Sequence, residues 1–170
     1  MSIEASVAAW LRFERRCKIV LCERTPREWR CGRPDVLGIT KDRYTIEVEI
    51  KRSVSDFRAN ARKRISEQYW RDTHAKALPK QFYFAMPSEL AAKVLSEVPT
   101  WAGMLTNGGR GIISLKPAEI NRQSVRLSIK EMCHVAYLQS NQVYSQMQAL
   151  ANFRSYERDR EKWFSPEYSI

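Results

Sequence analysis

The stretch that decides the fold is Arg33-Pro34-Asp35-Val36-Leu37-Gly38-Ile39, followed by a polar turn and Tyr44-Thr45-Ile46-Glu47-Val48-Glu49-Ile50-Lys51. In its second half, apolar residues alternate with polar or charged ones, which indicates a strand with one apolar and one charged face. The turn at residues 41–43 predicts a hairpin that brings Asp35 beside Glu49. Charges are costly in such a strand unless they are paired, hydrated or bound to metal, so the charged face predicts a site.

The size and charge of the chain limit its class. Its 170 residues fit one domain with a proper core. Lys and Arg total 29 against 19 Asp and Glu, which gives a net charge of +10 and an isoelectric point near 9.7. This excess favours a polyanionic partner, first of all nucleic acid, although charge alone leaves a generally basic protein equally open.

The sequence contains no apolar run of the roughly 18 residues that a membrane helix needs, and its N-terminus lacks the pattern of a signal peptide. We therefore expect a cytoplasmic protein, in the host cytosol if it is phage-encoded, without membrane contact. Its four cysteines form no CxxC pair. We expect reduced thiols and no zinc.

Periodicity predicts the elements around the hairpin. Ser53 begins a helix and Asp56 follows three positions later, as in a variant capping box whose acid meets the positive helix end. The other expected elements are a helix at 2–15, a strand at 18–22, a strand at 81–85, a helix at 87–98, and strands at 103–106 and 111–115. This alternation predicts an α/β fold with a mixed sheet flanked by helices over residues 1–117.

Residues 118–170 form a separate, mainly helical extension in this interpretation. The segment 128–160 contains no Gly or Pro and carries apolar residues at helical intervals, which predicts one long helix or two shorter ones. Three roles stay open for it: packing on the core, pairing with a second copy in a homodimer, or contact with another partner.

The opening stretch suits phosphodiester hydrolysis, which needs an activated water and neutralisation of charge on the phosphorus oxygens. Carboxylates that hold Mg²⁺ serve both needs. Asp35 and Glu49 are the expected ligands, with the carbonyl of Ile50 completing the set. Lys51 lies on the face of Glu49, where it can hold the water or meet the oxyanion. Glu47 is a candidate supporting acid, with solvent exposure as the equal alternative.

These residues carry a resemblance to a known superfamily. Pro34-Asp35 and, fourteen positions after Asp35, Glu49-Ile50-Lys51 resemble the signature of the PD-(D/E)XK nucleases, whose core has the order αβββαβ. The longer runs Glu49-Ile50-Lys51-Arg52-Ser53-Val54-Ser55-Asp56-Phe57-Arg58-Ala59 and Gln81-Phe82-Tyr83-Phe84-Ala85-Met86-Pro87 are similar to the MmcB-like DNA-repair branch. The match covers about residues 2–115.

The resemblance implies metal-dependent DNA cleavage, with Asp35 and Glu49 as ligands of Mg²⁺, or of Mn²⁺ in its place, and Lys51 as the catalytic lysine. Many members add an acid from the first helix. Glu4 is the candidate here and Glu14 the competitor, because spacing does not separate them.

Cations that follow the motif are candidate contacts for DNA phosphates, which position a duplex without reading its sequence. They are Arg52, Arg58, Arg62 and Lys63. Two classes of function follow: an endonuclease in DNA repair, recombination or phage-type DNA processing, or a non-catalytic DNA-binding or assembly module that keeps the nuclease fold. The intact Asp, Glu and Lys favour the endonuclease.

Overall fold

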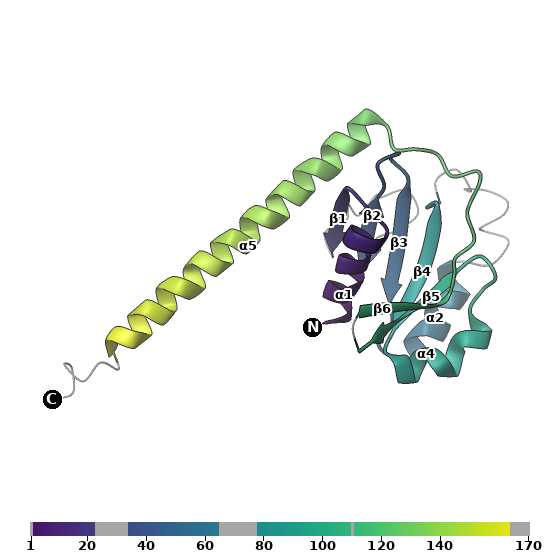
Figure 1. Ribbon diagram of the computed structural model, residues 1–170, viewed down its shortest axis with the longest axis horizontal. Helices are drawn as coiled ribbons and strands as arrows, with labels where there is room; N and C mark the ends of the chain where they lie inside the picture. The colour runs from purple at the N-terminus through teal and green to yellow at the C-terminus, as the bar shows by residue number, and fades with distance from the viewer. Residues whose placement is uncertain (1, 23–33, 65–77, 110, 164–170) are drawn as a thin grey trace.

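The computed structural model describes residues 2–22, 34–64, 78–109 and 111–163, without the side chains of 60–64 and 155–163. Its centre is a six-stranded sheet in the order β1-β2-β3-β4-β5-β6 (Figure 1). The strands are β1 Ile19–Cys22, β2 Val36–Ile39, β3 Thr45–Ile50, β4 Gln81–Met86, β5 Gly103–Gly108 and β6 Gly111–Lys116. Neighbours β1 to β3 are antiparallel, β3 to β5 are parallel, and β6 is antiparallel to β5. The expected mixed α/β sheet is confirmed.

The helices flank this sheet, as expected. In the described part of the chain the α-helices are α1 Ile3–Ala9, α2 Val54–Arg64, α4 Ser88–Val94 and α5 Ile129–Trp163. Among the described residues from α1 to β4, the order is a helix with its π-helical turn, three strands, a helix and a strand, in the order that the sequence predicted.

Two helices are less regular than expected. The expected helix at 2–15 splits into α1 and a π-helical turn at Trp10–Glu14, in which the Arg15 N–H donates to the Trp10 carbonyl at 3.0 Å. The expected helix at 87–98 ends as α4 at Val94 and continues as a single 3₁₀ turn. Periodicity places apolar residues on a face but does not distinguish these tighter or wider turns from an α-helix.

Helix α1 covers one face of the sheet. Val7 of α1, together with Trp10 and Leu11 of the π-helical turn that follows it, is buried against a cluster that includes Val48 and Tyr83. The rings of Trp10 and Tyr83 meet edge to face with centroids 5.4 Å apart. This face carries the apolar half of the alternation in β3, which is therefore confirmed.

Gly38 allows α1 and the following turn to lie close to β2. A Cβ at this position would be 2.8 Å from Cys17 Sγ and 2.9 Å from a methyl group of Leu11. Any larger residue would require the side chains of Cys17 and Leu11 to shift away from β2.

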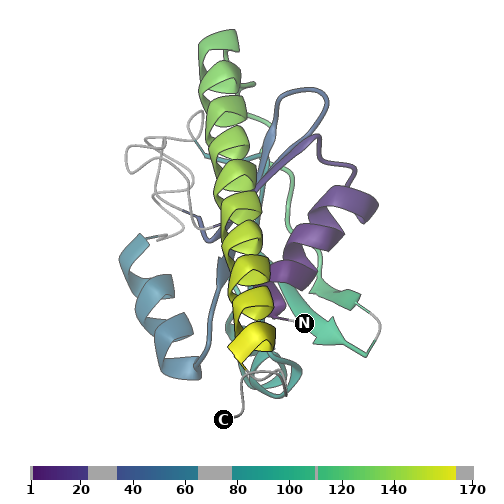
Figure 2. The same cartoon turned by 90° about the vertical axis from the view of Figure 1, so that its left-hand side faces the viewer.

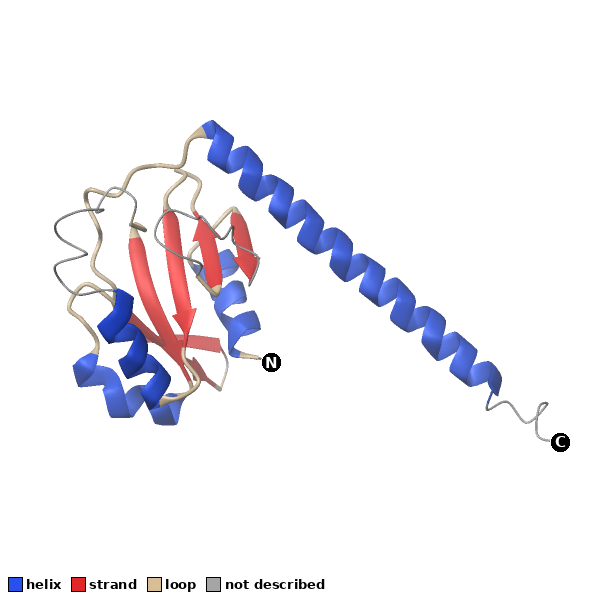
Figure 3. Cartoon of the chain, turned by 180° about the vertical axis from the view of Figure 1, so that it is seen from behind, coloured by secondary structure: helices blue, strands red, loops and turns tan. Residues whose placement is uncertain are grey.

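The opposite face is covered by two separate groups of apolar side chains. At β4 and β5, Phe57 of α2 contacts Phe84 at a centroid distance of 5.0 Å, and Phe82 contacts Trp101 at 5.5 Å. At β1 and β2, Leu21 and Leu37 pack against Leu127 and Val135 of the C-terminal segment. Figures 2 and 3 show α1 and α2 on opposite sides of the sheet.

The polar half of β3 lies between these two groups. In the sheet register Glu47 is paired with Leu37 on one side and Phe82 on the other, so all three share a face. Thr45, Glu47, Glu49 and Lys51 are all buried. The strand is thus covered on both faces, and its charged side chains are enclosed rather than solvated.

Helix α5 is a single helix of 35 residues. It begins with a full capping box, in which Ser128 Oγ accepts from the Glu131 N–H at 3.2 Å and Glu131 Oε2 accepts from the Ser128 N–H at 2.7 Å. Its first turns pack on β1, and the remainder runs away from the body of the molecule (Figure 1). None of the helices in the described part of the chain has the length and apolar character to cross a membrane.

Cys17 offers a test of this packing. Burial raises the pKa of its thiol to about 11, with Arg15 and Arg12 opposing the shift. We expect Cys17 to react with Ellman's reagent at pH 8 on the order of 100-fold more slowly than a thiol of ordinary pKa, because the thiolate is the nucleophile. The exposed Cys133 should react first. A Cys17→Ala variant with an unchanged number of slowly reacting thiols would contradict the assignment.

The same shift has a consequence for stability. A folded pKa above the unfolded value of 9.0 means that the contribution of the Cys17 thiol is present below pH 9 and is lost as the pH rises through about 11. Urea unfolding of the wild type and of Cys17→Ala over this range would measure the difference.

Candidate active site

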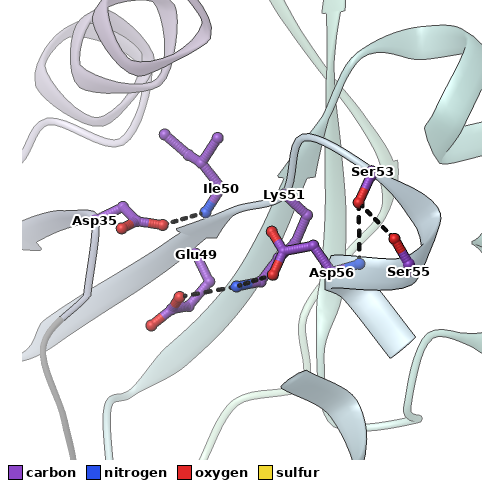
Figure 4. Close-up of polar contacts among 7 residues, drawn as sticks. All are labelled: Asp35, Glu49, Ile50, Lys51, Ser53, Ser55 and Asp56. Carbon is purple, nitrogen blue, oxygen red and sulfur yellow. Dashed lines mark hydrogen bonds and ion pairs between the residues drawn. The ribbon is translucent and has the colours of Figure 1, made fainter. Parts of the chain in front are cut away.

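Asp35 lies directly before β2, in line with the strand register. Since Val36 is paired with Val48 in an antiparallel ladder, the next pair outward is Asp35 with Glu49. Asp35 Oδ2 accepts a hydrogen bond from the Ile50 N–H at 2.6 Å (Figure 4). The structure thus brings together the two carboxylates that the hairpin was expected to join.

Glu49 and Lys51 form a buried ion pair on the same face. Lys51 Nζ is 3.3 Å from Glu49 Oε2, and the two residues are only 4% and 5% exposed. The Lys51 N–H donates to the Ala85 carbonyl at 2.9 Å, which fixes the end of β3 against β4. The lysine is therefore held by a rigid strand end rather than by a mobile loop.

The start of α2 adds a second carboxylate near the lysine. Ser53 Oγ accepts from the Asp56 N–H at 3.0 Å, so Ser53 caps the helix as predicted. The carboxylate of Asp56 lies 3.9 Å from Lys51 Nζ (Figure 4). The expected role of Asp56 at the helix end thus comes with an ion pair that the sequence analysis missed. The sequence indicates this ion pair only through the short spacing between Lys51 and Asp56, which the start of α2 brings close together.

The carbonyl of Ile50 lies on the Asp35 side of β3. In an extended strand, the N–H and C=O of one residue point to the same neighbouring strand, and those of the next residue point to the opposite one. The Ile50 N–H meets Asp35, whereas the Lys51 N–H meets β4. The Ile50 carbonyl therefore points toward β2 with Asp35.

These donors fit a hard divalent cation. Among the described residues, no group of three or more His, Cys, Asp or Glu side chains is arranged to hold a metal. Mg²⁺ is typically held by one or two carboxylates, together with water and substrate phosphates, rather than by a complete protein cage. Asp35, Glu49 and the Ile50 carbonyl supply a set of oxygen donors of that size.

Glu47 is on the same face, two residues before Glu49. It is 6% exposed and lies between Leu37 and Phe82 in the register, deeper in the sheet than Asp35. The alternative of a solvent-exposed Glu47 is wrong. Glu47 therefore lies two residues further from the end of β3 than Glu49, which is opposite Asp35.

The structure separates the two candidate acids of the first helix. Glu4 Oε1 accepts from Arg52 Nη2 at 2.8 Å, so Glu4 lies beside the residue that follows Lys51. The pKa of Glu4 is lowered, chiefly by its backbone hydrogen bond. Burial opposes this effect, and Arg52 also lowers the pKa. Glu14 instead lines an open cavity of about 480 Å³ with Phe13, Asn107 and Gly109. Of the two, Glu4 is the one next to the site.

The expected phosphate contacts have partners within the chain. Arg58 donates two hydrogen bonds to the carboxylate of Glu97, at 2.8 and 2.6 Å, and joins α2 to the turn after α4. These bonds raise the pKa of Arg58 and lower that of Glu97. Arg52 pairs with Glu4 while staying 80% exposed at its side chain. The side chains of Arg62 and Lys63 lie outside the described residues.

The fold and site define an α/β protein with a mixed sheet and a paired-carboxylate strand end. No protein-family model and no curated protein matches the chain. The chain is similar to the solved structure of a protein of unknown function from Silicibacter pomeroyi, with a TM-score of 0.57 and 20% sequence identity over 89% of this chain and 90% of that one. The covered share exceeds what residues 1–117 alone supply, so the likeness in fold extends into the C-terminal segment.

Proposed function

We propose that the protein is a metal-dependent DNA endonuclease of the PD-(D/E)XK superfamily, related to its MmcB-like branch. One observation carries the proposal: Asp35 bonded to the Ile50 N–H opposite Glu49, with Lys51 Nζ 3.3 Å from Glu49. Two carboxylates and a lysine at one end of adjacent strands can hold a metal ion and stabilise the charge that develops during phosphodiester hydrolysis.

Asp35, Glu49 and the Ile50 carbonyl would hold Mg²⁺, with Mn²⁺ as a substitute. A cation there supplies a Lewis acid for the phosphate oxygens and lowers the pKa of water. Lys51 would donate a hydrogen bond to the attacking water or to the oxyanion that develops on phosphorus. Asp56 keeps a negative charge beside the ammonium on the side away from Glu49. Glu4 would position Arg52, with which it is paired, beside the site. Glu47 would be a supporting acid.

The DNA-binding role would belong to Arg52 and Arg58, which are exposed near this site, and to Arg62 and Lys63, whose side chains lie outside the described residues. The proposal includes a cytoplasmic location, in keeping with DNA as the substrate and with the reduced thiols of Cys17 and Cys133.

Incubation of supercoiled, nicked, flapped, branched and linear DNA with Mg²⁺ or Mn²⁺ tests the proposal. We expect cutting of at least one form and none in EDTA. Binding without metal and without nicking of any form would favour the non-catalytic module.

We further propose that α5 joins two copies of the chain. Beyond the turns packed on β1, its exposed apolar residues Val143, Met147, Leu150 and Phe153 extend over three turns. Burying such side chains contributes roughly 1.5–3 kcal/mol each, so four from each copy can offset the cost of association, about 4–15 kcal/mol.

Deletion of residues 146–170 is therefore expected to convert a dimer into a monomer in multi-angle light scattering. The same measurement on Met147→Glu/Leu150→Glu keeps the chain length and should give the same monomer. An unchanged mass in both would leave this surface to a different partner.

A further inference from the structure

A second group of cations gathers at the end of the sheet opposite the candidate active site. We call it the basic edge and define it by Lys18, Lys41, Arg43, Lys80, Arg122 and Arg126. These residues come from the start of β1, the β2–β3 turn, the residue before β4, and the segment between β6 and α5. Figure 1 shows that this last segment crosses to the end of the sheet where β2 turns into β3.

Backbone hydrogen bonds hold these segments together. The Leu127 N–H donates to the Arg43 carbonyl at 2.9 Å, and the Asn121 N–H donates to the Lys80 carbonyl at 2.9 Å. The Lys80 N–H in turn donates to Thr45 at 2.9 Å. Backbone hydrogen bonds between these segments therefore hold the cationic residues close to one another, so their proximity does not depend on flexible side chains alone.

An aromatic ring sits at the centre of the basic edge. Lys80 Nζ lies 4.5 Å and Arg126 Cζ 5.5 Å from the ring centroid of Tyr44. Such contacts hold cations without neutralising them. Lys18, Lys41, Arg122 and Arg126 are exposed.

The two ends of the sheet differ in how their cations are held. Near the candidate active site, Lys51, Arg52 and Arg58 are paired with carboxylates of this chain. At the basic edge, the ion pairs among described residues include neither Lys80 nor Arg122. Positive charges such as those of Lys80 and Arg122, which no ion pair among the described residues neutralises, are suited to a polyanion.

We infer that the basic edge is a binding site for the phosphodiester backbone of DNA, separate from the candidate active site. Tyr44 and Lys51 are seven residues apart on one strand, which spans about 23 Å at roughly 3.3 Å per residue. At about 3.4 Å per nucleotide along one strand, this corresponds to roughly seven nucleotides of a duplex. The inference rests on the proposed function only for the choice of DNA as the polyanion.

The test compares two double variants with the same change of charge. Lys80→Gln/Arg122→Gln alters the basic edge, and Lys93→Gln/Arg154→Gln alters exposed cations on α4 and α5. Binding of a fluorescein-labelled 20-base-pair DNA duplex is measured in EDTA at several salt concentrations, so that cutting does not enter the result. Thermal unfolding by circular dichroism confirms that both variants are folded.

We expect the first variant to lose affinity on the order of 50-fold at 0.1 M salt and to reduce the slope of log K against log salt by about two, with the second variant close to wild type. Equal slopes for the two variants would overturn the inference. It would also be overturned if Lys80→Gln/Arg122→Gln weakened binding only to an RNA duplex of the same sequence or only to phosphatidylserine vesicles. Because no metal is present, this result is independent of whether the protein cuts DNA.

Discussion

A Lys51→Ala variant is expected to cut DNA on the order of 10³-fold more slowly than the wild type while binding it with similar affinity. Lys51 Nζ is held between Glu49 and Asp56, at 3.3 and 3.9 Å, and the residue is only 4% exposed. Its ammonium group is therefore positioned before substrate arrives. Loss of one preorganised donor to developing charge typically lowers the rate by 10²–10³-fold, and loss of water positioning adds to this.

Single-turnover cutting with Mg²⁺, together with DNA binding in EDTA, measures the two effects separately. Asp56→Asn is a matched control. It removes a charged partner of Lys51, but it keeps a side chain of the same size and the backbone N–H that donates to Ser53. We expect it to retain more activity than Lys51→Ala. Equal rates for Lys51→Ala and the wild type would show that Lys51 has no part in catalysis.

The pair of Glu49 and Lys51 is also expected to matter for stability. A Lys51→Met variant should lower the free energy of unfolding by about 3 kcal/mol, because Glu49 keeps its buried charge and loses a neutralising partner. Glu49 is 5% exposed and cannot regain water without movement of β3. The double variant Glu49→Gln/Lys51→Met should cost less than the sum of the two single changes.

Urea unfolding of all four proteins in EDTA closes this double-mutant cycle. The expected coupling is on the order of 1–3 kcal/mol. Strictly additive effects would mean that the contact at 3.3 Å does not contribute to folding.

The strand that carries the site could be predicted because its information is local. Alternation from Thr45 to Lys51 assigned each residue to a face, and the register then placed Asp35 opposite Glu49. The burial of that charged face could not be predicted. The apolar groups on either side of that face include Phe57 and Phe84 on one side and Leu127 and Val135 on the other, and these come from segments that are distant in sequence.

The carboxylate partners of Arg52 and Arg58 could not be predicted either, because they are distant in sequence. Arg58 and Glu97 are 39 residues apart, and Arg52 and Glu4 are 48 apart, so no helical or strand period connects them. Spacing within the first helix also could not separate Glu4 from Glu14. The position of Arg52 separates them in the folded chain.

For the C-terminal segment, the sequence predicted helical structure but not whether it forms one helix or two. The absence of Gly and Pro predicted helix, and Ser128 with Glu131 marks its start. Periodicity could not tell one helix from two, since the surfaces that it packs on change along its length. Met132 and Val135 meet the sheet, whereas Val143 and Met147 are exposed.

The cutting of supercoiled plasmid in Mn²⁺ by the wild type and by Asp35→Asn tests most directly whether Asp35 serves metal-dependent DNA cleavage. Asparagine keeps an oxygen that accepts from the Ile50 N–H, so the hairpin is preserved while the charge that would hold the metal is lost. We expect open-circular or linear product from the wild type and none from the variant. Equal cutting by both proteins, or none by either on any form of DNA, would contradict this expectation.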